Sequence, residues 1–556
     1  MVRPPLSSSG AEIYSKQILL AIPRLLSSQD RDETSPTYGC FDREYWGWAT
    51  KEFSNIDVQR SVFPLAFVWN TPFPGNEYHQ QKKVLTWILA GLLYWCEVQH
   101  PDGSFDHLYP NEHSYVGAAF TLFEICKTFQ IIAPFMPRSF REKLLSHMNK
   151  AGCYLLNREE EHGFITNHRA GAACALYHLF LITSREAYQS KANDIINVIA
   201  HRQSSEGWFY EYCGPDPGYE TLGINYLAQY YQLSGDPKVR DMLQRSISFL
   251  SYFVHPNETI GGEYGSRVTE LYFPGGFEIM SEFNSNASAI ASFMRGSIHS
   301  LQAVHLTSLD HRNFVPYLGS YCIALRSMLT RRRTQALALL PFQKLGWHYF
   351  PKAGMCLNAT VSSYTVIGVG RGVVKVFRKG KLVFSHCGYA GILANKTAVS
   401  TQMSGSASQI LATPNRMSFK LHFFKVPFRV MTPFRFMIFR FFNYTIGRSY
   451  FFNDLIRRHL IVGKFISPTP RPLFPMKREI TIDETKLTIL DELESHGQNF
   501  SSLKAVEKFT TILIASSKYF QQCELVESLK TRDIAPQLRK AGRVQMKFEV
   551  DLLGRR

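Results

Sequence analysis

Four turns in the first half of the chain carry side chains that could move a proton or neutralise a negative charge. Asn167 and His168 stand in the second turn, Tyr219 ends the third, and Arg267 lies in the fourth. An amide, an imidazole, a phenol and a guanidinium that converge can form an acid–base site. We predict these four as catalytic residues. Neighbouring polar and aromatic side chains are predicted to bind substrate: His113, Tyr115, Tyr212, Glu220, Tyr264 and Trp46.

Each of these side chains also has a simpler interpretation. Polar residues before a helix commonly cap it, and polar residues in a loop commonly stabilise the turn. Convergence of several such residues is the feature that favours a site over a set of caps.

Amphipathic helices separate the turns. Turn glycines at 103, 163, 207 and 262 are 60, 44 and 55 residues apart, about the length of a helix pair with its loops. Such pairs bury their apolar faces by closing into a ring or by stacking as a solenoid. In a ring the inner-helix N-termini meet at one mouth, which favours carboxylates and sulfates. The predicted helices cover residues 82–98, 114–131, 138–156, 168–183, 185–202, 219–233, 237–254, 278–305 and 312–331.

Residues 37–66 are rich in aromatic side chains. Trp46 lies here with Asp42, Arg43 and Arg60, a mixture that suits stacking on sugar rings with polar anchors. The same segment could instead be a lid whose aromatic rings pack on the helices below. The sequence leaves both interpretations open.

After residue 333 the pattern changes to short alternating segments. Residues 373–384 alternate across a turn at Lys379-Gly380, which is typical of a β-hairpin. We predict a multidomain α + β chain: an N-terminal arm or lid (1–80), an α/α toroid (81–333) and an antiparallel β-sandwich (334–556). Residues 478–490 are also predicted to form short strands or a hairpin, and later predicted strands cover residues 509–515 and 543–552.

The net charge of +17 comes from the C-terminal part. Residues 334–556 hold 33 Lys/Arg against 13 Asp/Glu, whereas residues 1–333 hold 29 against 32. This excess indicates an acidic partner, either a polyanion or a membrane surface, or a solvated basic face. No recognised nucleic-acid module accompanies the charge, so nucleic acid is not expected as a partner.

Residues 418–464 interleave nine Lys/Arg with many Phe and contain one acid, Asp454. The spacing of the charges excludes a membrane span. The segment could lie on an anionic membrane surface, or it could form sandwich strands and a packed helix with an exposed basic edge.

Cysteine usage and the N-terminus bear on the compartment. The ten cysteines show no paired spacing, and the first residues lack the apolar run of a signal peptide. We therefore expect reduced thiols and a cytoplasmic protein, with peripheral contact to a membrane left open.

The chain has helix pairs followed by a sheet domain that opens with Phe350-Pro-Lys-Ala-Gly354. In this it resembles the heparinase II/III-like polysaccharide lyases, over roughly residues 37–400. The resemblance implies action on an acidic, uronate-containing polysaccharide, with Asn167, His168 and Tyr219 matching the family's Asn, His and Tyr. The family's sheet domain typically carries a His-x-His-x-Asp-like segment after a Gly-rich turn. This chain has Gly370-Arg-Gly-Val-Val-Lys-Val-Phe377 there, so no cofactor is predicted, and a divalent metal in the sheet domain is left open.

The resemblance also implies the reaction. A base removes the proton beside a uronate carboxylate, and the 4-linked sugar then departs. Neutralising the carboxylate, for which Asn167 and Arg267 are candidates, stabilises the intermediate by on the order of 3–4 kcal/mol per donor. Tyr219 or His168 would act as the base, worth roughly 10²–10⁴-fold in rate. We expect a nearby cation, from Arg267 or His168, to lower the pKa of Tyr219.

Two alternatives share these residues. If the proton returns on the other face, the protein is a uronosyl C5-epimerase of polysaccharide biosynthesis. If the chemistry has been lost, it is a non-catalytic polysaccharide-binding or scaffold protein. A sheet-domain metal site would favour the lyase, and a mouth without a Tyr near a cation would favour the scaffold.

Overall fold

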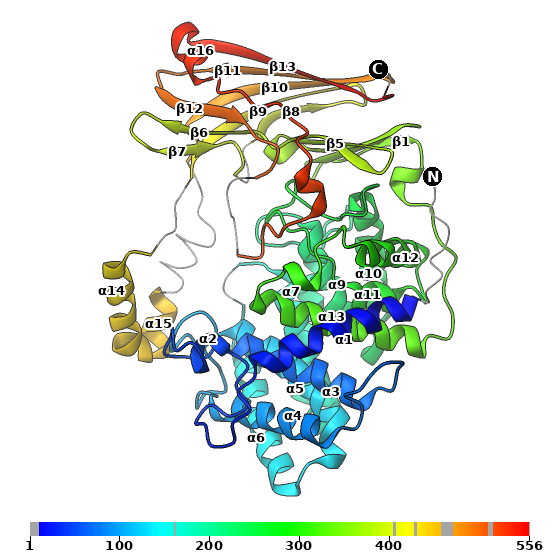
Figure 1. Ribbon diagram of the computed structural model, residues 1–556, viewed down its shortest axis with the longest axis vertical. Helices are drawn as coiled ribbons and strands as arrows, with labels where there is room; N and C mark the ends of the chain where they lie inside the picture. Colours follow the sequence, from blue (N-terminus) through cyan, green and yellow to red (C-terminus); the bar gives the residue numbers. More distant parts are fainter. Residues whose placement is uncertain are drawn as a thin grey trace.

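The computed structural model describes residues 10–160, 163–403, 407–426, 431–456, 471–509 and 515–554. Helices form the first part of the chain and antiparallel strands the second, which confirms the predicted fold class (Figure 1). The helices of the first part are α1 Gly10–Ser28, α2 Arg43–Trp46, α3 Val62–Asn70, α4 Lys82–Glu97, α5 Tyr115–Ile132, α6 Arg138–Asn157, α7 Thr166–Thr183, α8 Glu186–Arg202, α9 Pro217–Ser234, α10 Pro237–Leu250, α11 Pro274–Met280, α12 Ser285–Ser300 and α13 His311–Thr330.

The helical part is a closed ring of paired helices. The inner helices α3, α5, α7, α9, α11 and α13 each pack on the next, and α13 packs again on α3. An outer helix covers each of them: α4, α6, α8, α10 and α12 pack on the preceding inner helix, and α1 packs on α13. Because inner and outer helices alternate along the chain, the N-termini of the inner helices share one mouth of the ring.

Small side chains let the inner helices approach one another closely. Gly171 of α7 faces Phe120 of α5, and a Cβ at position 171 would lie only 2.5 Å from the phenyl ring. α5 is apolar enough to cross a membrane by length and composition, but 83% of its apolar window is buried in the ring. Burial of each large apolar side chain stabilises the ring by about 1.5–3 kcal/mol. We expect Gly171→Leu to separate α5 from α7.

Two predictions about the helical part need correction. The helix predicted over 278–305 is two helices, because the chain turns after Met280 and Asn284 caps α12 by accepting a hydrogen bond from the Ala287 amide at 2.8 Å. The segment predicted as an arm or lid packs within the ring. Its α1 lies on α13, and its α3 is an inner helix buried along eight of nine residues.

The C-terminal part has two antiparallel sheets, one ordered β1-β2-β3-β4-β5 and the other β12-β6-β7-β9-β10-β11-β13, with β8 paired to β9. Apolar residues of both sheets share one core, as in a sandwich. The strands are β1 Gly346–Phe350, β2 Met355–Ala359, β3 Ser363–Gly368, β4 Val373–Arg378, β5 Lys381–His386, β6 Tyr389–Leu393, β7 Ala398–Ser400, β8 Ala407–Ala412, β9 Arg416–Lys425, β10 Phe474–Ile482, β11 Lys486–Glu494, β12 Phe500–Ala505 and β13 Arg543–Asp551.

A buried ion pair lies between the two sheets. Arg478 of β10 donates from Nε to Asp491 of β11 at 2.6 Å and also contacts the carbonyl of Gly372, beside β4 of the other sheet. The segment predicted over 478–490 covers the end of β10, a turn and the start of β11, and the strand predicted over 543–552 matches β13. Residues 510–514 of the 509–515 prediction lie outside the described residues.

Three short helices complete this part: α14 Pro433–Tyr444, α15 Tyr450–Ile456 and α16 Ala535–Ala541. α14 and α15 lie within the basic, aromatic segment 418–464, whose first residues belong to β9 and whose residues 457–464 lie outside the described residues. Figure 1 shows α14 and α15 away from the sheets and beside the helical ring.

Candidate active site

Hydrogen bonds to backbone carbonyls join three of the predicted turns at the mouth of the ring. Thr166, at the start of α7, donates from its amide and its hydroxyl to the carbonyl of Tyr210 (3.1 and 2.8 Å). Ser266 donates to the carbonyl of Glu211 at 2.6 Å. The turns that carry Asn167, Tyr212, Tyr219 and Arg267 are therefore parts of one connected region.

Asn167 is held by a buried carboxyl group. Its side-chain amide donates to one oxygen of Glu211 at 2.7 Å, and its backbone amide donates to the other at 3.0 Å. Burial raises the pKa of Glu211 well above its usual value, more strongly than the hydrogen bonds from Asn167 lower it. The Glu211 carboxyl therefore favours its neutral form.

Arg267 lies over an aromatic ring. Its guanidinium carbon is 3.9 Å from the ring centroid of Tyr212, a cation–π geometry. Burial raises the pKa of the Tyr212 phenol, and Arg267 opposes this rise. Tyr212 has a positive φ of 67°, an unusual conformation for a non-glycine residue and one that clusters at functional sites.

Tyr219 lies in the first turn of α9, at the N-terminal end, where the helix dipole gives a partial positive charge. Its hydroxyl contacts the hydroxyl of Ser516, which comes from the C-terminal part. Burial raises the pKa of Tyr219 well above its usual value, and the nearby Tyr212 adds to the rise. The prediction of a lowered Tyr219 pKa is therefore wrong, because Arg267 stacks on Tyr212 instead.

Asp216 ties Tyr219 and Arg267 together. One oxygen of this N-cap residue accepts from the Tyr219 amide at 3.1 Å and contacts the Thr269 hydroxyl. The other oxygen accepts from the Arg267 amide at 2.7 Å. Ser517 donates to the Arg267 carbonyl at 2.6 Å, so a segment of the C-terminal part also touches the mouth.

Comparisons with known proteins bear on the fold that carries this region. Residues 58–275 match the family model of the ulvan lyase N-terminal domain, a range that contains all four residues of the connected region. A Paenibacillus xanthan lyase structure matches with a TM-score of 0.54 and 11% identity, covering 91% of this chain and 47% of that chain. A Streptomyces coelicolor chondroitin AC lyase, solved in complex with chondroitin sulphate, matches with 0.55 and 10%, covering 91% and 69%. The fold is that of the toroid polysaccharide lyases.

The toroid lyase fold is what these structures establish, because their identity to the chain is low. The chain spans about half the length of the xanthan lyase. A sequence comparison with curated proteins gave no match. The finer resemblance to the heparinase II/III-like group is carried by neither the family model nor these two structures.

Two predicted residues of the toroid lie next to the connected region and share a buried carboxylate. His168 contacts Glu160 through Nδ1 at 2.7 Å. Tyr115 begins α5 and is 3% exposed. Burial raises the pKa of Tyr115, and Glu160 adds to the rise. His168 therefore binds this carboxylate through one of its two ring nitrogens.

Two others lie further along the toroid rim. His113 contacts Asp102 through Nδ1 at 2.8 Å, and its ring meets that of Tyr450 from α15 at 5.7 Å. Trp46, in α2, donates from its indole to the carbonyl of Ser28 at 2.9 Å and is half-buried. This indole bond anchors the segment to α1, in keeping with the packing interpretation of residues 37–66.

The structure contradicts the prediction of Glu220 and Tyr264 as substrate ligands, because both are buried in packing. Glu220 is fully buried and accepts from the Ser246 hydroxyl at 2.6 Å, between α9 and α10. The Tyr264 hydroxyl donates to the Gly261 carbonyl at 2.7 Å and contacts His255 at 2.7 Å.

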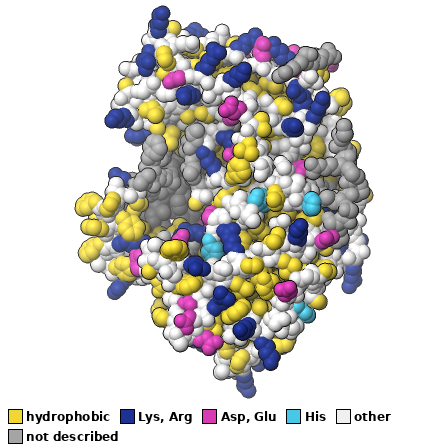
Figure 2. Space-filling view, in the orientation of Figure 1, with side chains coloured by type: hydrophobic (Ala, Val, Ile, Leu, Met, Phe, Trp, Pro, Cys, Tyr) yellow, Lys and Arg dark blue, Asp and Glu magenta, His cyan; other side chains and the backbone are white. Residues whose placement is uncertain are grey.

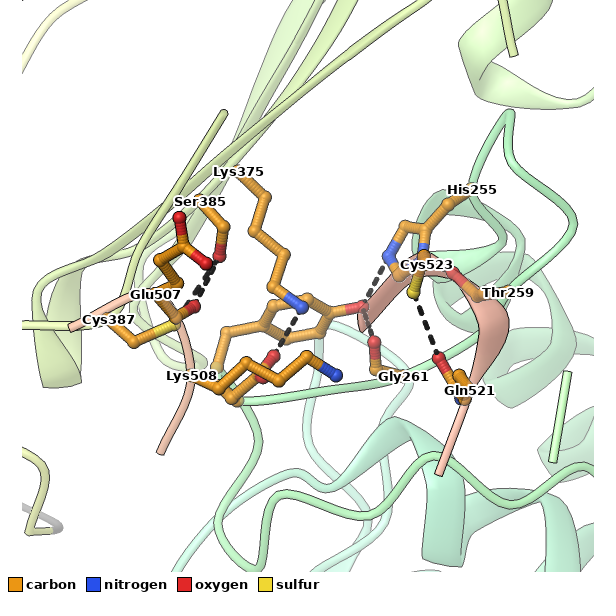
Figure 3. Close-up of polar contacts among 12 residues, drawn as sticks. His255, Thr259, Gly261, Lys375, Ser385, Cys387, Glu507, Lys508, Gln521 and Cys523 are labelled. Atoms are coloured by element: carbon orange, nitrogen blue, oxygen red, sulfur yellow. Dashed lines mark hydrogen bonds and ion pairs between the residues drawn. The ribbon is translucent and has the colours of Figure 1, made fainter. Parts of the chain in front are cut away.

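The residues found in place of the family's metal-binding segment do not suit a metal ion. Lys375 of β4 forms a buried ion pair with Glu263, and Lys508 lies nearby (Figure 3). Across the described parts of the chain, no group of three His, Cys, Asp or Glu side chains is arranged to hold a metal.

A cavity of about 870 Å³ lies elsewhere, between α10 and β1, and none of the predicted site residues lines it. Glu211, Asp216 and Ser516 take part in the site but were not predicted. Asp216 before Pro217 carries the sequence signature of a helix N-cap, whereas nothing in the sequence connects Ser516 with this mouth.

Proposed function

We propose that the protein is a polysaccharide lyase that cleaves an acidic, uronate-containing polysaccharide by proton abstraction and β-elimination, in the manner of the heparinase II/III-like group. The observation that supports this most is the arrangement at the toroid mouth. An amide (Asn167), a phenol at a helix N-terminus (Tyr219) and an arginine stacked on a second phenol (Arg267 and Tyr212) belong to one hydrogen-bonded region.

Asn167 would neutralise the uronate carboxylate. A side-chain amide has two N–H donors, and Glu211 takes one of them at 2.7 Å. The second can donate to a substrate carboxylate. Burial raises the pKa of Glu211, which favours the neutral carboxyl, and a neutral carboxyl can hold the amide in place without repelling the negative substrate.

Tyr219 would take the proton, with Tyr212 and Arg267 holding the substrate beside it. The N-terminus of α9 favours negative charge on the phenol, and the Ser516 hydroxyl can donate to the phenolate. Burial opposes ionisation in the free protein. A substrate whose carboxylate is neutralised makes the transfer easier, because its C–H becomes more acidic as the enolate is stabilised.

The acidic substrate class has independent support from charge. The chondroitin AC lyase neighbour was solved in complex with chondroitin sulphate, an anionic polymer. In this chain, residues 334–450 contain 15 Lys/Arg and no Asp or Glu. We place the protein in the cytoplasm, in keeping with ten cysteines that show no paired spacing in the sequence.

The test is to incubate the purified full-length chain with a panel of uronate polymers. A lyase gives an unsaturated product that absorbs in the ultraviolet. An epimerase gives no absorbance but exchanges the C5 proton with deuterium from the solvent. Binding without either signal across the panel would favour the scaffold alternative and contradict the proposal.

A further inference from the structure

The outward face of α14 is strongly apolar. Phe434, Met437, Ile438 and Phe441 follow the i, i+3, i+4, i+7 spacing that places side chains on one helical stripe. Three of them, Phe434, Met437 and Phe441, are 67%, 64% and 73% exposed. A helix of a globular domain normally buries such a stripe, so this one requires an explanation.

The opposite face of α14 is fixed to the helical ring, which sets the direction of the exposed stripe. Arg440 pairs with Glu52 at 2.8 Å. The Asn443 carbonyl accepts from Asn111 at 3.0 Å. The ring of Phe439 meets that of Tyr109 at 5.4 Å. The helix therefore cannot turn its apolar stripe inward without losing these contacts.

α15 extends the same surface. Its Tyr450 faces inward, with the guanidinium of Arg158 3.8 Å from its ring centroid. Phe451, Phe452 and Leu455 are exposed. Figure 2 shows the result as a group of hydrophobic side chains at the left edge, where Figure 1 places α14 and α15. We call the exposed side chains of α14 and α15 the apolar face.

Cationic side chains accompany the apolar face. Arg435 and Arg448 are exposed beside it, and residues 431–456 contain three arginines against one acid. Aromatic and aliphatic side chains flanked by arginine suit the boundary between lipid headgroups and acyl chains in an anionic membrane. A symmetric contact between two copies would instead bring two surfaces of net positive charge together, which is unfavourable.

We propose that the apolar face binds the surface of an anionic phospholipid membrane. Phe434, Met437 and Phe441 enter the headgroup region, while Arg435 and Arg448 bind lipid phosphates. The rim residues Asn111 and His113 contact the inward faces of α14 and α15, so they lie about one helix diameter from the bilayer. This inference is independent of the proposed reaction.

Vesicle co-sedimentation of the full chain tests the proposal. Vesicles of phosphatidylcholine with about a quarter phosphatidylglycerol should bind the protein, and phosphatidylcholine alone should bind it much less. The triple variant Phe434→Ser, Met437→Ser, Phe441→Ser should bind the anionic vesicles roughly tenfold or more weakly. These side chains are exposed, so the variant should unfold at the wild-type temperature.

Matched controls distinguish binding through the apolar face from non-specific adsorption of other exposed apolar side chains to the vesicles. Leu337, Leu345 and Val361 are each more than half exposed elsewhere, and replacing these three with Ser should leave binding unchanged. Arg435→Glu with Arg448→Glu should weaken binding to anionic vesicles, whereas Lys379→Glu with Lys381→Glu, on the sheets, should have a smaller effect.

Three results would overturn the proposal. One is wild-type protein that stays in the supernatant with anionic vesicles. Another is a triple Ser variant that binds them as tightly as wild type. The third is a wild-type dimer that the triple Ser variant converts to a monomer, because that would make the apolar face a contact between two copies.

Discussion

The guanidinium carbon of Arg267 lies 3.9 Å from the ring centroid of Tyr212. Tyr212 precedes Tyr219, the tyrosine that the sequence predicts as the base, by seven residues. Arg267 opposes the rise in the Tyr212 pKa that burial causes. The mouth therefore contains a cation beside a tyrosine, but that tyrosine is Tyr212 and not the predicted base, Tyr219. This separates two roles: Tyr212 with Arg267 would hold substrate, and Tyr219 would take the proton.

Asn167→Ala should slow turnover on the protein's substrate by roughly 10²–10³-fold, because the donor to the uronate carboxylate is lost. It should also lower the free energy of unfolding by about 1–3 kcal/mol, since Glu211 loses a buried partner. Asn157, exposed at the end of α6, offers a control: Asn157→Ala should change neither quantity. Turnover of Asn167→Ala within twofold of wild type would exclude Asn167 from the reaction.

Glu211→Gln should lose less activity than Glu211→Ala, because its amide oxygen can still accept one of the two hydrogen bonds from Asn167, although its NH2 group cannot accept the other. Glu211→Ala should lose activity by about tenfold or more, since Asn167 loses the partner that orients it. Steady-state kinetics check both variants. If Glu211 must be ionised for turnover, Glu211→Gln will be as inactive as Glu211→Ala, contrary to the neutral carboxyl that we infer.

The helices and the general place of the site could be predicted from the sequence. Apolar spacing defines α4 to α10 closely, because each helix buries one face in the ring. The exact partners could not be predicted. Neighbouring residues on a helix point about 100° apart, so Tyr219 reaches the mouth while Glu220 is buried against Ser246. Ser516 meets Tyr219 from 297 residues away, which no local pattern encodes.

The break between α11 and α12 was missed for a related reason. Asn284 caps α12 in the middle of a stretch that keeps helical apolar spacing on both sides. A cap inside such a stretch gives a weak signal beside the surrounding hydrophobic pattern. Tyr264 was misassigned because its turn shares the polar composition of the others, while its own hydroxyl packs against His255.

Stability should depend on Glu270, which lies at the junction of the two domains. Burial raises its pKa to about 7, with Lys508 opposing the rise and Glu263 adding to it. The folded chain therefore holds this proton more tightly than the unfolded chain. The stabilisation is fully present below about pH 4.5 and is lost as the pH rises through about 7.

Glu270→Gln should remove this pH dependence. Between pH 5 and pH 8, the free energy of unfolding should fall less in the variant than in wild type, by on the order of 1–3 kcal/mol. Urea unfolding at the two pH values measures it, and the exposed Glu186→Gln serves as a control. Parallel pH slopes for wild type and Glu270→Gln would show that Glu270 is ionised in the folded protein throughout this range.

Binding to an anionic polysaccharide should weaken as salt is added. The basic excess lies in the C-terminal part, and Figure 2 shows Lys and Arg side chains spread over the sheets. Exposed charges are screened over roughly 10 Å at 0.1 M salt. Titration of a fluorescent uronate polymer at low and moderate ionic strength checks this, and an affinity indifferent to salt would contradict it.

The most direct test of the proposed reaction is turnover by Tyr219→Phe on the substrate that wild type cleaves, measured by absorbance of the unsaturated product. Tyr231→Phe, on the same helix α9, is the matched control. The proposed role of Tyr219 predicts that Tyr219→Phe folds and binds substrate as wild type does but forms no detectable product, while Tyr231→Phe remains active. Product formation by Tyr219→Phe at the wild-type rate would contradict the assignment of Tyr219 as the base.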